Sequence, residues 1–158
     1  MSNKRTPVVI GVVLALVLLA LFMIPKFTDP TRGFASAWAE AGVGCLAGGH
    51  SRTAQHFHPK LAIGVDGLQE SIPANVGVLR TCMAEVHTHD ASGTLHVEAI
   101  AADKITHLKD FFTVWGKTIS RDGYSLVMTV DGKPNFELGE LILKDGQQIV
   151  LEYKSNRQ

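Results

Sequence analysis

The chain has 158 residues, enough for one domain of ordinary size, and its 15 basic residues balance its 15 acidic ones. With a net charge of zero, no polybasic surface argues for a nucleic-acid partner or for binding to an anionic membrane face. Hydrophobic residues make up 46% of the chain, and many of them lie in one N-terminal segment.

This segment, between Pro7 and Pro25, holds 17 residues without a charge. As a helix with a rise of ~1.5 Å per residue it would be ~25 Å long, at the short end of what crosses a bilayer. Lys4 and Arg5 precede it, and the positive-inside rule keeps such residues in the cytoplasm. The sequence therefore predicts a cytoplasmic stub and transmembrane anchor over residues 1–28 of a single-pass protein in the cytoplasmic membrane. The alternative is a cleaved signal peptide, and both interpretations place the rest of the chain in the periplasm or extracellular space.

Residues 29–44 are predicted to be a linker, with room for two helical turns before Gly42 and Gly44. Residues 45–158 are predicted to form an extracytoplasmic, histidine-rich domain dominated by strands. The predicted fold class is α+β, with an N-terminal transmembrane helix followed by one small, mainly antiparallel β domain that carries one amphipathic helix.

The helix is predicted at residues 105–117, where apolar residues recur at helical spacing between Thr106, a candidate N-cap, and Gly116. Alternating patterns predict three later strands, at residues 124–130, 140–143 and 148–153. Asp-Gly pairs that begin at Asp66, Asp131 and Asp145 predict hairpin-type turns.

Residues 83–100 predict a β-hairpin whose turn is the four residues from Asp90 to Gly93. In this pairing His87 faces His96 and His89 faces Thr94. Because side chains alternate along a strand, one face is mostly apolar and is expected to contact the core; it carries Ala84, Val86, Thr88, Leu95, Val97 and Ala99. The other face is dense in metal-ligand side chains, and it carries Glu85, His87, His89, His96 and Glu98.

An earlier strand repeats this arrangement. His56 and His58 alternate with Phe57, and the apolar side then continues through Leu61 and Ile63. Five of the chain's seven histidines thus lie on the faces of predicted strands that point away from the core.

Two His-x-His pairs and a histidine opposite one of them suit a metal site, because imidazoles on neighbouring strands can converge on one ion at ~2.0 Å. The predicted ligands are His87, His89 and His96, with His56 and His58 as a further pair. Asp90, Glu85 and Glu98 can act as ligands or orient a ring through its second nitrogen. The set suits copper or zinc, and iron is not excluded. The competing interpretation is a solvated polar face, and His50 and His107 fall outside the pattern.

Cys45 and Cys82 are the two cysteines of the chain. In an oxidising compartment two cysteines in one small domain usually pair, so a disulfide is predicted. The alternative is that one or both thiolates bind a soft metal.

A longer pattern joins these residues, and it consists of Cys45, His56, His58, Pro59, Leu61, Ile72, Pro73, Ala74, Asn75, Gly77, Val78, Cys82, His87, Thr88, His89, Asp90, Ser92, Gly93, His96 and Glu98. It resembles a widespread family of uncharacterised bacterial and archaeal exported proteins, and the similarity extends from about Cys45 to Tyr153. Members often carry a further histidine where this chain has Lys60. The resemblance supports the domain limits and the choice of histidines, and it implies no particular activity.

The predicted function is that of a membrane-anchored, extracytoplasmic protein that handles copper or zinc through the histidines. The alternatives are an accessory or assembly subunit of a larger membrane complex and, third, a small metal-dependent enzyme with Glu85 or Glu98 as general base. No Gly-rich phosphate loop, nucleophile elbow or Cys-x-x-Cys motif is present, so no catalytic residue is predicted.

Overall fold

A computed structural model of the chain describes residues 10, 12–20, 32–47, 49–50 and 53–156. The chain divides into two units, Met1–Gly33 and Phe34–Gln158.

The first unit corrects the prediction of a membrane anchor. Residues 10 and 12–20 are helical, but among the described residues no helix is both long enough and apolar enough to cross a membrane. A helix over these positions is only ~16 Å long, against the ~30 Å of a bilayer's hydrocarbon core. Three predictions depended on that membrane span and are wrong for the same reason. They are the single-pass topology, the localisation in the cytoplasmic membrane and the membrane as a partner. Lys4 and Arg5, which gave the predicted orientation, lie outside the described residues.

The second unit is a mixed α/β fold whose strands pair mostly antiparallel. Its elements, in chain order, are α2 (Arg32–Glu40, which begins in the first unit), β1 (Cys45–Leu46), β2 (Gln55–Phe57), β3 (Lys60–Val65), β4 (Leu68–Glu70), β5 (Val78–Leu79), β6 (Cys82–Ala84), β7 (Val86–His87), β8 (His96–Ala99), α3 (Leu108–Trp115), β9 (Tyr124–Val130), β10 (Lys133–Asn135), the 3₁₀ helix η1 (Leu138–Glu140) and β11 (Gln148–Ser155).

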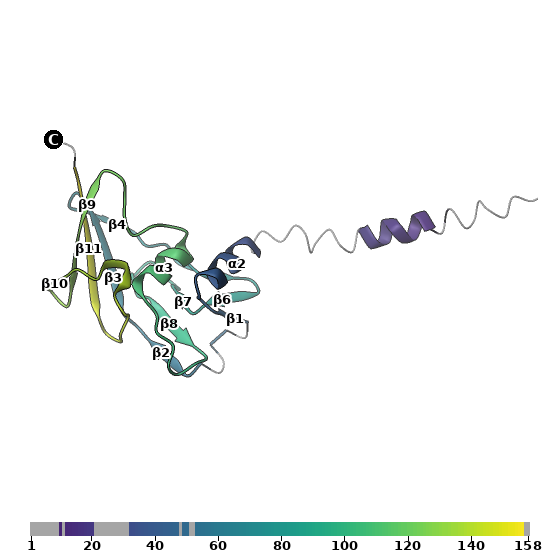
Figure 1. Cartoon of the computed structure of the whole chain (residues 1–158), viewed down its shortest axis with the longest axis horizontal. Helices are drawn as coiled ribbons and strands as arrows, with labels where there is room; N and C mark the ends of the chain where they lie inside the picture. Colours follow the sequence, from purple (N-terminus) through teal and green to yellow (C-terminus); the bar gives the residue numbers. More distant parts are fainter. Residues whose placement is uncertain (1–9, 11, 21–31, 48, 51–52, 157–158) are drawn as a thin grey trace, which may run out of the picture. The chain divides into compact units, whose positions relative to one another are not determined.

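Among the described residues these strands form three sheets, in the orders β10-β9-β11-β3-β4, β2-β8-β7 and β1-β6-β5 (Figure 1). Two predicted turns close hairpins in the largest sheet. Asp66 and Asp131 have positive φ angles of 51° and each is followed by a glycine with positive φ, as a type I′ turn requires. The central pair β11–β3 is parallel, and it brings together two strands from opposite ends of the domain's sequence.

Helix α3 begins later than predicted. His107, and not Thr106, is its N-cap, and the backbone N–H of His107 donates to Asp110 at 2.7 Å. Gly116 ends the helix in the left-handed conformation, as predicted. Phe111 and Phe112 of the helix are buried in the core. The strand predicted at residues 140–143 is wrong, because the chain forms η1 there and then a single bridge between Ile142 and His107.

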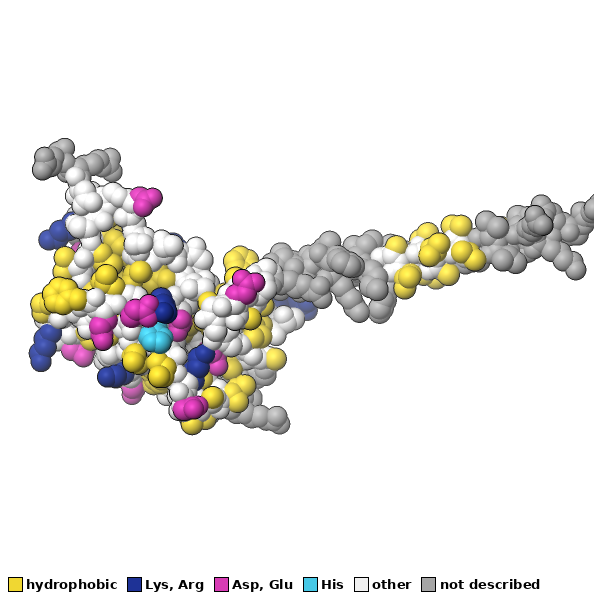
Figure 2. All heavy atoms as spheres, viewed as in Figure 1, with side chains coloured by type: hydrophobic (Ala, Val, Ile, Leu, Met, Phe, Trp, Pro, Cys, Tyr) yellow, Lys and Arg dark blue, Asp and Glu magenta, His cyan; other side chains and the backbone are white. Residues whose placement is uncertain are grey.

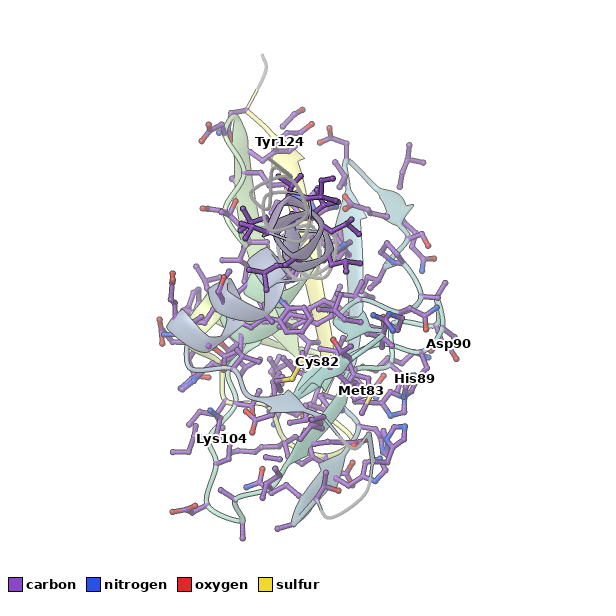
Figure 3. The ribbon with its side chains drawn as sticks, turned by 90° about the vertical axis from the view of Figure 1, so that its right-hand side faces the viewer. Cys82, Met83, His89, Asp90, Lys104 and Tyr124 are labelled. Atoms are coloured by element: carbon purple, nitrogen blue, oxygen red, sulfur yellow. A yellow bond between two sulfur atoms is a disulfide. The ribbon has the colours of Figure 1, made fainter. Side chains whose placement is uncertain are left out.

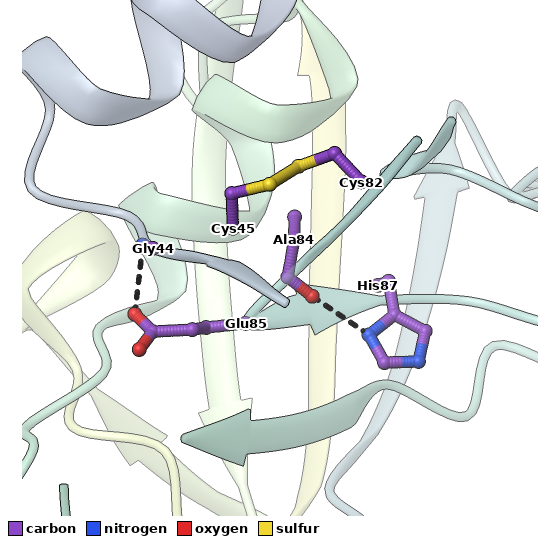
Figure 4. Close-up of a disulfide and its surroundings, with 6 residues drawn as sticks. All are labelled: Gly44, Cys45, Cys82, Ala84, Glu85 and His87. Atoms are coloured by element: carbon purple, nitrogen blue, oxygen red, sulfur yellow. Dashed lines mark hydrogen bonds between the residues drawn. A yellow bond between two sulfur atoms is a disulfide. The ribbon is translucent and has the colours of Figure 1, made fainter. Parts of the chain in front are cut away.

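The start of the second unit contributes to its core. Trp38 of α2 and Val43, both in the stretch predicted as a linker, are buried among residues of the later strands. Immediately after them, Cys45 and Cys82 form the predicted disulfide, which joins the paired strands β1 and β6 (Figure 4). The thiolate alternative for these two cysteines is therefore wrong. The apolar and charged side chains of the domain are mixed over the face in Figure 2, where histidine occupies only a small area.

Candidate metal centre

The small sheet β2-β8-β7 positions the histidines. His87 on β7 lies opposite His96 on β8, as predicted, and Val86 lies opposite Val97. On the other edge of β8, His56 of β2 lies opposite Glu98. Strand β8 therefore runs between the two His-x-His segments, which the sequence alone left unplaced relative to each other.

The loop between β7 and β8 departs from the predicted tight hairpin. Thr94 forms a bridge with Lys60 and does not pair with His89. Two backbone hydrogen bonds support this contact: Leu61 N–H donates to Gly93 at 2.8 Å, and Leu95 N–H donates to Pro59 at 2.9 Å. The same register that pairs β2 with β8 thus continues past His58 and brings it beside His96.

Six histidine rings gather in one cluster, which we call the histidine cluster. The nearest ring pairs have centroid separations of 4.6 Å (His58–His96 and His89–His96) and 4.7 Å (His56–His58 and His87–His89). His50 joins them with its ring centroid 5.2 Å from that of His89. Figure 3 shows His89 beside Asp90 at one edge of the domain.

The ligand atoms of the cluster fall into three groups in which all atoms lie within 4.8 Å of one another. These groups are His50 with His87 and His89, His56 with His58 and His96, and His87 with His96 and Glu98. Each can hold a metal ion, and the first two share no residue.

His87 is the buried centre of the cluster, with no exposed surface. Its Nδ1 lies 2.9 Å from the carbonyl oxygen of Ala84 (Figure 4). Since a carbonyl can only accept, Nδ1 carries the ring proton in the neutral form, and the lone pair is on Nε2. Burial, together with the charges of His89 and His96, lowers the pKa of His87 to about 4, against the weaker opposing effects of the Ala84 carbonyl and Glu98. The ring is thus neutral at ordinary pH, as a metal ligand must be.

The unprotonated ring nitrogen of His87 lies against a ring nitrogen of His89. Its Nε2 lies 3.1 Å from Nε2 of His89. Two nitrogens bound to one tetrahedral ion at ~2.0–2.1 Å stand ~3.3 Å apart, so the observed spacing is close to that of two ligands on one ion. A backbone carbonyl that fixes the other nitrogen of the ring is the usual support of a metal-bound histidine.

His96 lies between the two His-x-His segments. Burial lowers its pKa, and so do the charges of His89 and His58. Its Nδ1 is buried and has no hydrogen-bond partner among the described atoms. A buried polar atom without a partner is costly in an ordinary core, whereas a ring nitrogen that ligates a metal needs no proton and no donor.

Glu98 is more central than predicted. Its carboxylate is fully buried, with Oε1 2.6 Å from Nδ1 of His50 and 3.3 Å from Nε2 of His56. Its Oε2 is buried with no hydrogen-bond partner among the described atoms. A buried carboxylate without full compensation is unfavourable, and a bound cation supplies that compensation.

The other two predicted acidic residues do not join the cluster. Glu85 falls at a break between β6 and β7, so the alternation does not carry it to the histidine face. Its carboxylate instead accepts a hydrogen bond from the Gly44 backbone at 2.8 Å and lies 3.4 Å from Lys104. Lys104 is on the opposite side of the domain from His89 in Figure 3. Asp90 is exposed and caps its own turn, where hydrogen bonds from the Ser92 side chain and backbone lower its pKa.

Sequence reasoning missed His50. It lies in the connection between β1 and β2, where no strand alternation assigns a direction to its side chain. The structure nevertheless places it against Glu98 and the rings of His56, His87 and His89. His107 is outside the cluster, since it caps α3.

The donor set limits the kind of metal. Imidazole nitrogens and one carboxylate remain, because both thiols are used in the disulfide. Such ligands suit zinc, copper(II), nickel or iron, whereas copper(I) prefers thiolate or thioether sulfur.

No protein-family model, curated protein or solved structure matches the chain.

The depressed pKa of His87 predicts that metal-free protein loses stability in acid. The unfolded chain protonates this residue near its ordinary pKa of 6.5, but the folded chain does so only at about 4. The unfolded state thus binds more protons between these two pH values. The free energy of unfolding therefore decreases as the pH is lowered from 6.5 to about 4, and the loss is complete below that window. It amounts to ~3 kcal/mol at ~1.4 kcal/mol per pH unit.

Urea unfolding of chelator-treated wild type and His87→Gln at pH 7, 5.5 and 4 tests this expectation. The difference between the two proteins removes the effect of groups that titrate in both. The variant should lose less stability on acidification, and an equal loss in both proteins would contradict the assignment.

Proposed function

We propose that this chain is a metal-binding protein that handles copper or zinc through the histidine cluster. The observation that carries the proposal is the state of His87. Its Nδ1 is held by the Ala84 carbonyl, its buried ring is neutral, and its Nε2 lies 3.1 Å from that of His89. A solvated polar face requires none of these features, whereas a metal ligand must be neutral and is usually oriented by a partner on its other ring nitrogen.

The exposure of the outer rings favours binding and exchange of an ion. The side chains of His50 and His56 are 54% and 48% exposed, while Glu98 beneath them has no exposed surface. An ion can thus approach through the exposed histidines and reach buried ligands without a tunnel. The disulfide fits an oxidising compartment, where copper(II) and zinc are the relevant forms of these metals.

Isothermal titration with Cu²⁺ and Zn²⁺ tests the function on wild type, His87→Ala and His107→Ala. His87→Ala should weaken binding of the ion that His87 ligates by about 100-fold or more, equivalent to ~2.7 kcal/mol, because an incomplete ligand shell remains. His107→Ala is the matched control, because it removes a histidine outside the cluster and leaves the backbone N–H that donates to Asp110. Equal affinity in wild type and His87→Ala would refute the proposal.

A further inference from the structure

We infer that the cluster is a dinuclear centre, in which each histidine triplet binds one divalent ion and the Glu98 carboxylate bridges the two ions. This inference rests on the proposed function and specifies its stoichiometry. The first triplet is His50, His87 and His89, and the second is His56, His58 and His96.

The division into two triplets follows from the spacing of the ligand atoms. Within each triplet the atoms lie within 4.8 Å of one another, and no histidine belongs to both. Three histidines leave one position open in a four-coordinate ion. With one carboxylate oxygen added to each triplet, both shells become complete.

The Glu98 carboxylate lies between the two triplets. Its Oε1 contacts His50 of the first triplet at 2.6 Å and His56 of the second at 3.3 Å. It also groups with His87 and His96, again one residue from each triplet. Its second oxygen, Oε2, is buried and has no partner among the described atoms. A carboxylate that binds one ion through each oxygen gives both oxygens a partner. A carboxylate with a single hydrogen-bonded oxygen leaves the other oxygen without one.

The two triplets are close enough for a bridge. Across them, the ring centroids of His89 and His96 are 4.6 Å apart and those of His87 and His96 are 5.4 Å apart. Paired metal ions in proteins stand ~3.5–4 Å apart, a separation that one carboxylate spans. Two cations at that distance repel each other, and a buried anion between them attracts both and offsets this repulsion.

Metal stoichiometry and electron paramagnetic resonance test the inference, with Zn²⁺ and Cu²⁺ as probes. Wild type should bind two ions per chain. With Cu²⁺, the resonance signal should rise up to the first equivalent and then split or decrease with the second, because bridged copper(II) ions couple magnetically. His89→Ala and His58→Ala, one from each triplet, should each retain a single ion with an uncoupled signal.

Glu98→Gln tests the bridge while preserving the shape of the side chain. It should weaken binding of the second ion by about tenfold or more and leave the signals of two copper ions uncoupled. A thermal melt establishes that the variant folds; if it does not, the wild-type titration and the two single-triplet variants decide the question. One ion per chain in wild type, lost in His87→Ala, would overturn the dinuclear centre and leave the proposed function standing. No binding by wild type would defeat both.

Discussion

Removal of the disulfide should lower the free energy of unfolding by ~4 kcal/mol. Cys45 and Cys82 are 37 positions apart, and closing a loop of that length restricts the unfolded chain by this amount in the chain-entropy model. For a domain of this size the loss corresponds to a decrease of ~8–16 °C in melting temperature. Thermal melts of wild type with and without reductant measure it.

The double variant Cys45→Ala/Cys82→Ala provides the control. It should melt at the temperature of the reduced wild type, and reductant should leave its transition unchanged. Melting of wild type at the same temperature in both conditions would contradict the prediction.

The disulfide also lies close to the site. Strand β6 contains both Cys82 and Ala84, and the carbonyl of Ala84 holds His87 in the tautomer that leaves Nε2 unprotonated (Figure 4). Loosening β6 should therefore weaken metal binding as well as the fold, although no ligand is removed. The strand that carries the disulfide is thus also the strand that orients His87, the buried histidine of the cluster.

Local patterns in the sequence were sufficient for the parts of the site that depend on one strand pair. The alternation in residues 83–100 predicted the pairing of His87 with His96 and the burial of Val86, Leu95 and Val97. These features follow from the period of a β-strand, which is visible in sequence. The disulfide was predictable because only two cysteines were present.

The remaining features depend on contacts between distant segments. His50 reaches the cluster from a connection without periodicity, and Glu85 leaves it because the chain breaks between β6 and β7. The alternation of side chains also does not indicate how deeply a residue is buried. His87 and Glu98 were therefore predicted on the face that points away from the core, whereas both are fully buried. Hydropathy predicted a membrane helix over residues 8–24, but the described helical residues are too few to span a bilayer.

Gly93→Ala should be among the most destabilising single substitutions in the domain, because Gly93 holds the two histidine segments together. Its φ of 81° is in the left-handed region, and a Cβ added there would overlap the backbone oxygen of Leu61. The left-handed conformation alone costs a residue with a side chain ~1–2 kcal/mol. The overlap involves backbone that cannot move without breaking the hydrogen bond from Leu61 to Gly93, so the total should reach ~3 kcal/mol or more.

Gly67→Ala is the matched control, since Gly67 has a φ of 83° and a Cβ there would meet nothing within 4 Å. Urea unfolding should show that Gly93→Ala costs at least ~1–2 kcal/mol more than Gly67→Ala, whose cost is the conformational one alone. The Zn²⁺ affinity of the folded proteins should also separate them. The contact at Gly93 places His58 beside His96, so Gly93→Ala should weaken Zn²⁺ binding while Gly67→Ala leaves it unchanged. Equal stability and equal Zn²⁺ affinity in the two variants would show that this contact does not build the site.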